Sequence, residues 1–160
     1  MKLLKIALVA GMALVMTIIT LNNILMPAAT YGAIGAALSM ATTFKNPMEI
    51  WRAITSPALL WIIAVLIILC EGIGAILCWI GVARLWGARR SAVQFNQSKS
   101  MASIGLIWVG AFYFLGWLVI ANEWFAMWQS TKMNVLPDAF RLFGEALLIT
   151  IWLNTADTDT

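Results

Sequence analysis

The segment ALLWIIAVLIILCEGIGAILCWIGVARL, residues 58–85, is apolar throughout except for Glu71 and Arg84. A helix that crosses a bilayer needs about 20 predominantly apolar residues, and this segment exceeds that length. Segments 6–26 and 101–121 contain no charged residue and are also long enough, and we expect the helix of the latter to continue to residue 128. The sequence therefore predicts an all-α, membrane-embedded protein.

The composition agrees with this fold class. Of the 160 residues, 62% are hydrophobic and 11% are charged, whereas soluble domains carry about 25% charged residues. The chain has no histidine, which is the commonest metal ligand and general base at neutral pH. The net charge of +3 is too small and too scattered for a nucleic-acid-binding surface. Haem, zinc and catalytic-triad chemistry and nucleic-acid partners are therefore not expected.

A fourth apolar segment, 139–153, is shorter and contains Arg141 and Glu145. We predict a short or tilted span there, and a helix lying in the membrane interface is the alternative. The expected architecture is a four-helix bundle in a single domain, 1–160, with spans at 6–26, 58–85, 101–128 and 139–153. A long, partly helical outer loop joins the first two spans. Within it, 31–38 is expected to be re-entrant or to lie flat on the outer leaflet, and Asn46-Pro47-Met48-Glu49 predicts the start of a short helix.

Basic residues predict the orientation of these spans. Lys2 and Lys5 precede the first span, and Arg84, Arg89 and Arg90 lie around the loop between the second and third. By the positive-inside rule, both termini are expected in the cytoplasm, with the arginine cluster as an anchor that contacts anionic lipid headgroups. The first span is expected to remain in the protein, because no clear signal-peptidase cleavage site follows it.

The tryptophans fit the same orientation. Trp51, Trp61, Trp124 and Trp128 would fall near the outer interface, where an indole can keep its ring in an apolar zone and its N–H near water. Trp117 lies too deep for that zone, so we expect it to pack between helices.

Glu71 lies about midway along its span, near the centre of the bilayer. An ionised carboxylate costs several kcal/mol there unless it is protonated, paired or hydrogen-bonded. Small residues share its helix face, so Glu71 is expected to face another helix. Two interpretations are open: a proton-binding or ion-binding site, or a neutral carboxyl hydrogen-bonded to a backbone carbonyl or to Thr17 or Thr20.

Glu145 is the second carboxylate expected within the membrane. Arg141 precedes it by four residues and Asp138 precedes Arg141 by three, so ion pairs within one helix are predicted. A carboxylate pair between Glu145 and Glu71 is the alternative. No phosphate-binding loop, dinucleotide fingerprint, metal-ligand spacing or nucleophile motif occurs in the sequence. We therefore predict neither an enzyme nor a cofactor.

The segment Glu123-Trp124-Phe125-Ala126-Met127-Trp128-Gln129-Ser130, followed by Asn134 and Ala139-Phe140-Arg141, resembles a bacterial family of predicted small integral membrane proteins of unknown function. Asn22-Asn23, Ser39-Met40-Ala41-Thr42-Thr43-Phe44, Trp51-Arg52-Ala53-Ile54 and Glu71 match the same pattern in the same order. The chain departs from it at Ala41 and after Asn23, where acidic residues are usual, and at Val135-Leu136, where Gly-Gln is usual. The resemblance implies a four-helix protein of the bacterial inner membrane and no particular activity.

The matching polar and aromatic residues are expected to cluster at the outer ends of the spans. That expected cluster comprises Asn22, Asn23, Trp51, Arg52, Glu123, Trp124, Trp128, Gln129 and Arg141. Within it, we predict that Arg52 or Arg141 pairs with Glu123.

Three functions are compatible with these features. The first is a non-catalytic accessory or scaffold subunit that contacts other membrane proteins or a second copy of itself. The second is transport of protons, ions or small solutes through Glu71. The third is binding of an amphiphile, such as a lipid or quinone, at the outer cluster.

Overall fold

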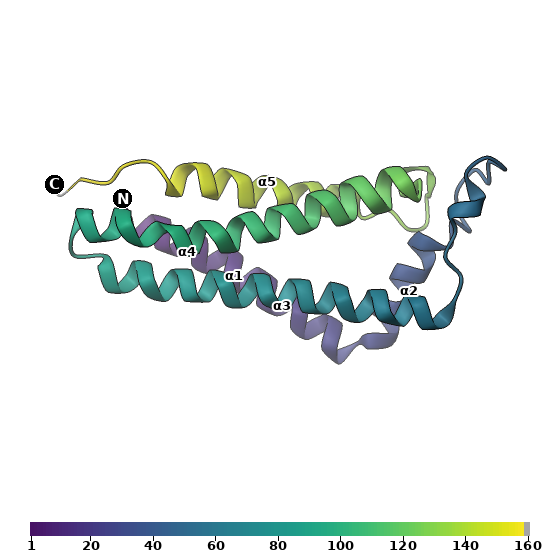
Figure 1. The fold of residues 1–160 in the computed structure, drawn as a ribbon, viewed down its shortest axis with the longest axis horizontal. Coiled ribbons are helices and arrows are strands. Elements are labelled where there is room, and N and C mark those ends of the chain that lie inside the picture. Colours follow the sequence, from purple (N-terminus) through teal and green to yellow (C-terminus); the bar gives the residue numbers. More distant parts are fainter. Residues whose placement is uncertain (159–160) are drawn as a thin grey trace.

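The computed structural model describes residues 1–158, and helices account for almost all of its regular structure. Figure 1 shows long helices lying side by side, with the start of α1 and the end of α5 at one end of the molecule, which we call the termini end. The opposite end carries the connection between α2 and α3, and we call it the loop end. The elements in chain order are α1 (Lys2–Leu25), α2 (Pro27–Leu38), η1 (Ile50–Arg52), α3 (Pro57–Ala88), α4 (Ala92–Ala111), η2 (Phe112–Trp124), η3 (Met127–Gln129) and α5 (Leu136–Leu153). The all-α prediction is confirmed.

Among residues 1–158, three helices are long and apolar enough to cross a membrane: α1, α3, and the continuous helix Ala92–Trp124 formed by α4 and η2. The three strongest sequence predictions therefore correspond to real helices. The predicted end of the third one near residue 128 is wrong, because the helix stops at Trp124 and Ala126 adopts a left-handed backbone with φ 52°. Its start at Ala92 is earlier than predicted, since the Ser91 side chain accepts a hydrogen bond from the backbone N–H of Gln94 and caps the helix.

Helix α5 runs antiparallel to the helix formed by α4 and η2 and lies beside it (Figure 1). Its inward-facing side chains belong to the main apolar core, namely Ala139, Leu142, Ala146 and Leu153. With 18 residues, α5 has a length of about 27 Å at 1.5 Å per residue. It does not count among the three helices that are apolar enough to span, so the fourth span stays a prediction.

The outer loop is more helical than the sequence indicated in its first part, around residues 31–38, and less helical in its second part, after Asn46. Residues 31–38 belong to helix α2, which packs Ile34 and Leu38 against Leu60 and Ala64 of α3. The predicted helix start at Asn46 yields only a turn, in which Asn46 Oδ1 accepts from the N–H of Met48, followed by the single 3₁₀ turn η1. Five residues after Arg52, Pro57 begins α3. Proline lacks a backbone N–H, and this costs nothing at the first position of a helix, where the N–H has no partner within the helix.

Helices α3 and α4 approach each other closely at two glycines. A Cβ atom added to Gly81 would lie 2.5 Å from the Ala102 Cα, and one added to Gly105 would lie 2.8 Å from the Cys78 backbone nitrogen. Small residues thus allow two backbones to approach, as was expected for the helix face around Glu71. Gly81 and Gly105 thus serve a contact between two helices of the same chain.

Candidate functional site

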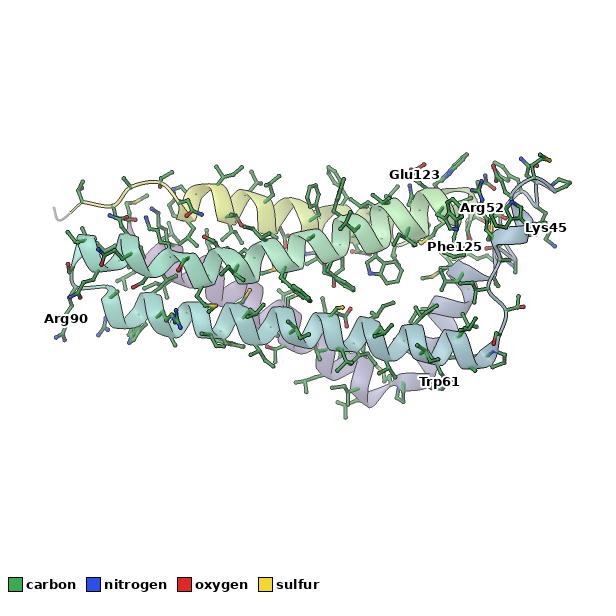
Figure 2. All side chains as sticks on the ribbon, in the orientation of Figure 1. Lys45, Arg52, Trp61, Arg90, Glu123 and Phe125 are labelled. Carbon is green, nitrogen blue, oxygen red and sulfur yellow. The ribbon has the colours of Figure 1, made fainter. Side chains whose placement is uncertain are left out.

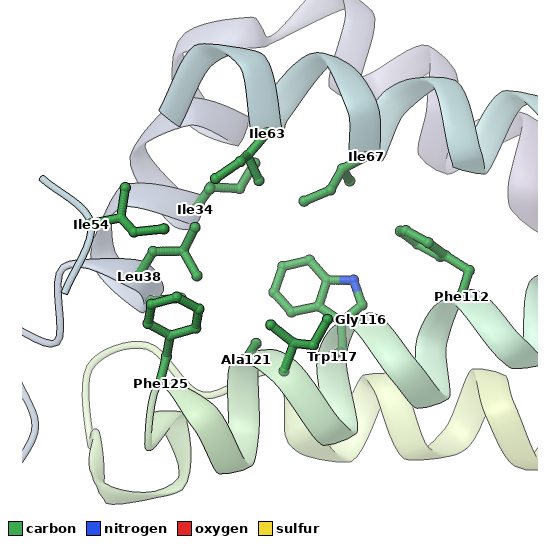
Figure 3. A pocket seen from close by; sticks show the side chains of 12 residues that line it. Ile34, Leu38, Ile54, Ile63, Ile67, Phe112, Gly116, Trp117, Ala121 and Phe125 are labelled. Carbon is green, nitrogen blue, oxygen red and sulfur yellow. The ribbon is translucent and has the colours of Figure 1, made fainter. Parts of the chain in front are cut away.

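An apolar cavity of about 300 Å³ lies between α2, α3 and η2 toward the loop end (Figure 3). Small-molecule sites occupy roughly 300–1,000 Å³, so this cavity has room for one short chain or ring. Its lining consists of Ile34, Ala37, Leu38, Ile54, Ile63, Ile67, Phe112, Gly116, Trp117, Ile120, Ala121 and Phe125. We refer to it as the apolar cavity.

The π-helical geometry of η2 produces one side of this cavity. Phe112 and Ala121 are nine residues apart, and at about 100° per residue an α-helix would place them on opposite faces. In a π-helix, each backbone N–H bonds to the carbonyl five residues back, which widens the turn; the Phe125 N–H bonds to the Ile120 carbonyl in this way, at 3.1 Å. Phe112, Gly116 and Ala121 therefore share the face that lines the cavity (Figure 3).

Arg52 lies where the apolar cavity reaches the loop end. Its guanidinium carbon is 4.5 Å from the centre of the Trp124 ring and 5.8 Å from that of Trp51. Its Nη1 donates to the Trp124 carbonyl at 3.2 Å, whereas its Nε is buried without a hydrogen-bond partner. Ile54 and Phe125 line the cavity. Arg52 is thus two residues from one lining residue, and its guanidinium contacts Trp124, the chain neighbour of the other; Figure 2 shows Arg52 and Phe125 at the loop end.

Side-chain contacts fasten the outer loop to the segment after η2. The Thr42 and Ser130 hydroxyls are 2.6 Å apart, and the Phe44 N–H donates to Gln129 Oε1 at 3.0 Å. The Phe44 and Trp128 rings meet edge to face at 6.0 Å, in the geometry preferred by aromatic pairs. These contacts fix the position of the chain around Arg52.

A second cavity, of about 290 Å³, contains Glu71 in its lining, and we call it the carboxylate cavity. Asn23 Nδ2 donates to Glu71 Oε2 at 2.7 Å, and Asn23 Oδ1 accepts from the Thr30 hydroxyl at 3.0 Å. The alternative in which Glu71 bonds to Thr17 or Thr20 is not formed, because those hydroxyls donate to the Ala13 and Met16 carbonyls of their own helix. The remaining lining residues include Tyr113, Trp117, Asp138 and Arg141.

The predicted ion pairs of α5 are present. Arg141 Nη1 lies 3.2 Å from Glu145 Oε1, and Arg141 Nη2 lies 3.9 Å from Asp138 Oδ1. Glu145 lines a separate cavity between α1 and α5, together with residues such as Gly11. Asp138, not Glu145, is the acid that shares a cavity with Glu71.

The expected outer cluster divides into two groups and single residues with separate partners. Trp51, Arg52 and Trp124 form one group, and Trp128 and Gln129 meet Phe44 in the next. Asn23 bonds to Glu71, Arg141 pairs within α5, and the Asn22 carbonyl accepts from the Met26 N–H at the end of α1.

Glu123 has a different partner from the one predicted. Its Oε1 accepts a hydrogen bond of 2.7 Å from Asn122 Nδ2. Within residues 1–158, neither Arg52 nor Arg141 makes an ion pair with it. The predicted pair is therefore not formed, because Arg52 donates to the Trp124 carbonyl and Arg141 is taken up by acids of its own helix.

Trp117 lies between the two cavities and lines both. It is partly buried and packs against the core, which agrees with the expectation that it packs between helices.

At the termini end, the structure contains an ionic cluster that sequence reasoning missed. Asp157 Oδ2 lies 2.7 Å from Lys5 Nζ and 2.6 Å from Lys99 Nζ, and all three side chains are at least 95% buried. Both ammonium groups also donate to the Thr155 carbonyl. Burial raises the pKa of Asp157, but the hydrogen bonds and charges of the two lysines outweigh it and hold that pKa below its ordinary value.

The predicted anchor residues surround this end. Arg84 and Arg90 are exposed, and Arg89 stacks over Trp86 with 4.3 Å between the guanidinium carbon and the ring centre. Arg89 also donates to the Trp86 carbonyl at 2.6 Å. Their exposure is compatible with the predicted contact with headgroups.

A family model described as "Predicted small integral membrane protein (DUF2165)" matches residues 1–156. The chain belongs to this family. The resemblance to a family of predicted small integral membrane proteins is thereby confirmed, and the match covers both cavities and the two lysines of the ionic cluster, ending one residue before Asp157. No curated protein and no solved structure matches the chain.

Proposed function

We propose that this integral membrane protein binds a single-chain amphiphile with an anionic head, such as a fatty acid, in the apolar cavity. The observation that carries the proposal is the position of Arg52, which is two residues from Ile54 in the lining of an apolar cavity and lies against Trp124, the chain neighbour of the lining residue Phe125. This is the third of the functions that the sequence left open, narrowed to one class of ligand.

The size and lining of the cavity favour one hydrocarbon chain. A volume of about 300 Å³ is at the lower end of small-molecule sites, too small for both chains of a phospholipid. The lining offers aliphatic and aromatic side chains only, apart from the Trp117 indole (Figure 3). A buried apolar chain would gain roughly 0.8 kcal/mol per methylene relative to water, although a chain arriving from lipid gains far less.

Arg52 supplies the specificity for the head. Among the described residues it makes no ion pair, and its Nε lacks a hydrogen-bond partner. A guanidinium can bind a carboxylate through two parallel N–H donors, and the Trp51 and Trp124 rings hold this one in place. A carboxylate bound there would give the guanidinium an ionic partner.

The same proposal includes the topology: four spans in the bacterial inner membrane with both termini in the cytoplasm. The start of α1 and the end of α5 lie at one end of the molecule (Figure 1), as an even number of spans requires. The apolar cavity would then open near the outer leaflet. The accessory-subunit role stays a prediction without support of this kind, because the small residues Gly81 and Gly105 are used in a contact within the chain.

Photo-crosslinking with a diazirine-bearing palmitic acid tests this proposal on the full chain in nanodiscs. We expect adducts on peptides of η2 and of residues 54–67. The R52Q variant should lower this labelling at subsaturating probe by about tenfold or more, since losing a hydrogen bond to a charged group costs about 1.5–3 kcal/mol. The methyl ester of the probe should label the wild-type protein as weakly as the acid labels R52Q.

K132Q is the matched control for R52Q, because it removes an exposed cation of the loop end, and it should leave the labelling unchanged. A second test variant, G116L, places a leucine side chain in the cavity and should lower the labelling; the added Cβ itself fits, since it meets nothing nearer than Phe112 at 3.9 Å. G87L is the control for G116L, because it adds the same side chain in open space. Labelling that survives both R52Q and G116L, or that is spread evenly over the lipid-facing helices, would overturn the proposal.

A further inference from the structure

We propose that Glu71 is a proton-binding site that exchanges protons with the loop end through the carboxylate cavity. This inference is independent of the amphiphile site, because it rests on the other cavity and on different residues. Three observations carry it: the burial of Glu71, the composition of the cavity, and the pairing of the surrounding charges.

Glu71 is held in a way that suits both of its protonation states. Its residue is 3% exposed, and Asn23 donates to only one carboxylate oxygen, Oε2. The Thr30 hydroxyl donates to the amide oxygen of Asn23 and so fixes the amide with its NH₂ group toward Glu71. This single neutral hydrogen bond stabilises the carboxylate without supplying the charge that a permanently ionised group at this depth needs.

The carboxylate cavity links Glu71 with the exposed end of α5. Its volume of about 290 Å³ is room for several waters at roughly 30 Å³ each. Glu71, Tyr113, Asp138 and Arg141 provide the polar partners that buried water requires. The Asp138 and Arg141 side chains are 74% and 54% exposed, so the cavity meets solvent or headgroups there. A hydrogen-bonded chain of water along these groups is the path for the proton.

No described basic residue around Glu71 is free to neutralise its carboxylate, so a proton is the partner that can do so. From α1 and α2 it meets Asn23, Ile19 and Ala33, none of which is charged. From η2 it meets the Tyr113 phenol, and from α5 the cavity receives Asp138 and Arg141. Arg141, the one basic residue in the lining, already pairs with Asp138 and Glu145. Glu71 therefore has no cation of its own among the described residues.

Labelling with dicyclohexylcarbodiimide, an apolar carbodiimide, tests this inference on the full chain in nanodiscs. The protonated carboxyl adds across one C=N bond of the reagent to give an O-acylisourea, which rearranges to a stable N-acylurea that retains all atoms of both reactants. We expect an adduct on the peptide that contains Glu71, with a yield that falls as the pH is raised from about 5 to about 9, the range in which buried carboxyls lose their protons. E71Q should carry no adduct at that position.

Variants of the neighbouring amide test whether the site titrates as proposed. N23L removes the donor to the carboxylate, so the pH midpoint of labelling should move to higher pH. N22L is the matched control, because Asn22 is exposed on the adjacent position, and it should leave the midpoint unchanged. Labelling of Glu71 that is absent, or that is constant across the pH range, would overturn the inference, as would equal midpoints for N23L and N22L.

Discussion

Replacing Asp157 with alanine is expected to lower the free energy of unfolding by about 3–5 kcal/mol. Two buried ammonium groups, those of Lys5 and Lys99, share the single Asp157 Oδ2 atom at 2.7 and 2.6 Å. Removing the carboxylate leaves two positive charges in a site with little water and brings their repulsion into play. The measurement is titration from mild detergent into sodium dodecyl sulfate, followed by circular dichroism.

The same cluster predicts how stability depends on pH. Because the pKa of Asp157 is held below its ordinary value in the folded protein, its contribution is complete above the ordinary range near pH 4. It is lost as the pH falls through the lowered folded-state pKa. The difference in unfolding free energy between wild type and D157A should therefore shrink on acidification and stay constant between about pH 6 and 8.

Two further variants test whether the loss in D157A comes from leaving the two lysine charges buried and unpaired. D138A removes an exposed acid that lies 3.9 Å from Arg141, and its effect should remain within about 0.5 kcal/mol. The triple variant K5M/K99M/D157L should recover most of the loss, since apolar replacement of a whole buried ionic group is often neutral. A D157A variant as stable as D138A would show that the cluster is hydrated and contributes little.

The sequence predicts the long helices because their cause is local. Hydrocarbon around segments 6–26, 58–85 and 101–121 requires every backbone donor and acceptor to be satisfied within the segment, and an apolar run of that length therefore forms a helix. The ion pair of Arg141 and Glu145 was predictable for the same reason, since residues four apart on a helix are neighbours.

The features that depend on distant contacts were not predictable in this way. The pairing of Arg52 with the Trp124 carbonyl depends on the path of the outer loop, and that of Lys5 with Asp157 joins residues near opposite ends of the chain. One signal was present: Asp157 is an acid placed shortly after the last helix, close to where α1 and α4 would begin. The π-helical turn of η2 also escaped, because no residue pattern separates it from an α-helix in an apolar run.

Replacing Gly81 or Gly105 with alanine is expected to lower the free energy of unfolding by about 1–3 kcal/mol each, or more. The added methyl group would lie 2.5 Å from the Ala102 Cα at Gly81 and 2.8 Å from the Cys78 nitrogen at Gly105. These atoms belong to the backbone and cannot rotate away, so α3 and α4 must move apart and lose packing over their whole contact. The loss therefore exceeds any gain from the better helix propensity of alanine, which is about 1 kcal/mol.

G87A is the matched control for this pair of variants, because it makes the same change in α3 where an added Cβ meets nothing within 4 Å. It should leave stability unchanged or raise it by up to about 1 kcal/mol. The same detergent titration compares the three proteins. If G81A and G105A were as stable as G87A, the two backbones would have to be farther apart than the structure has them, and the geometry of both cavities, which depends on how α3 meets the helix of α4 and η2, would change with them.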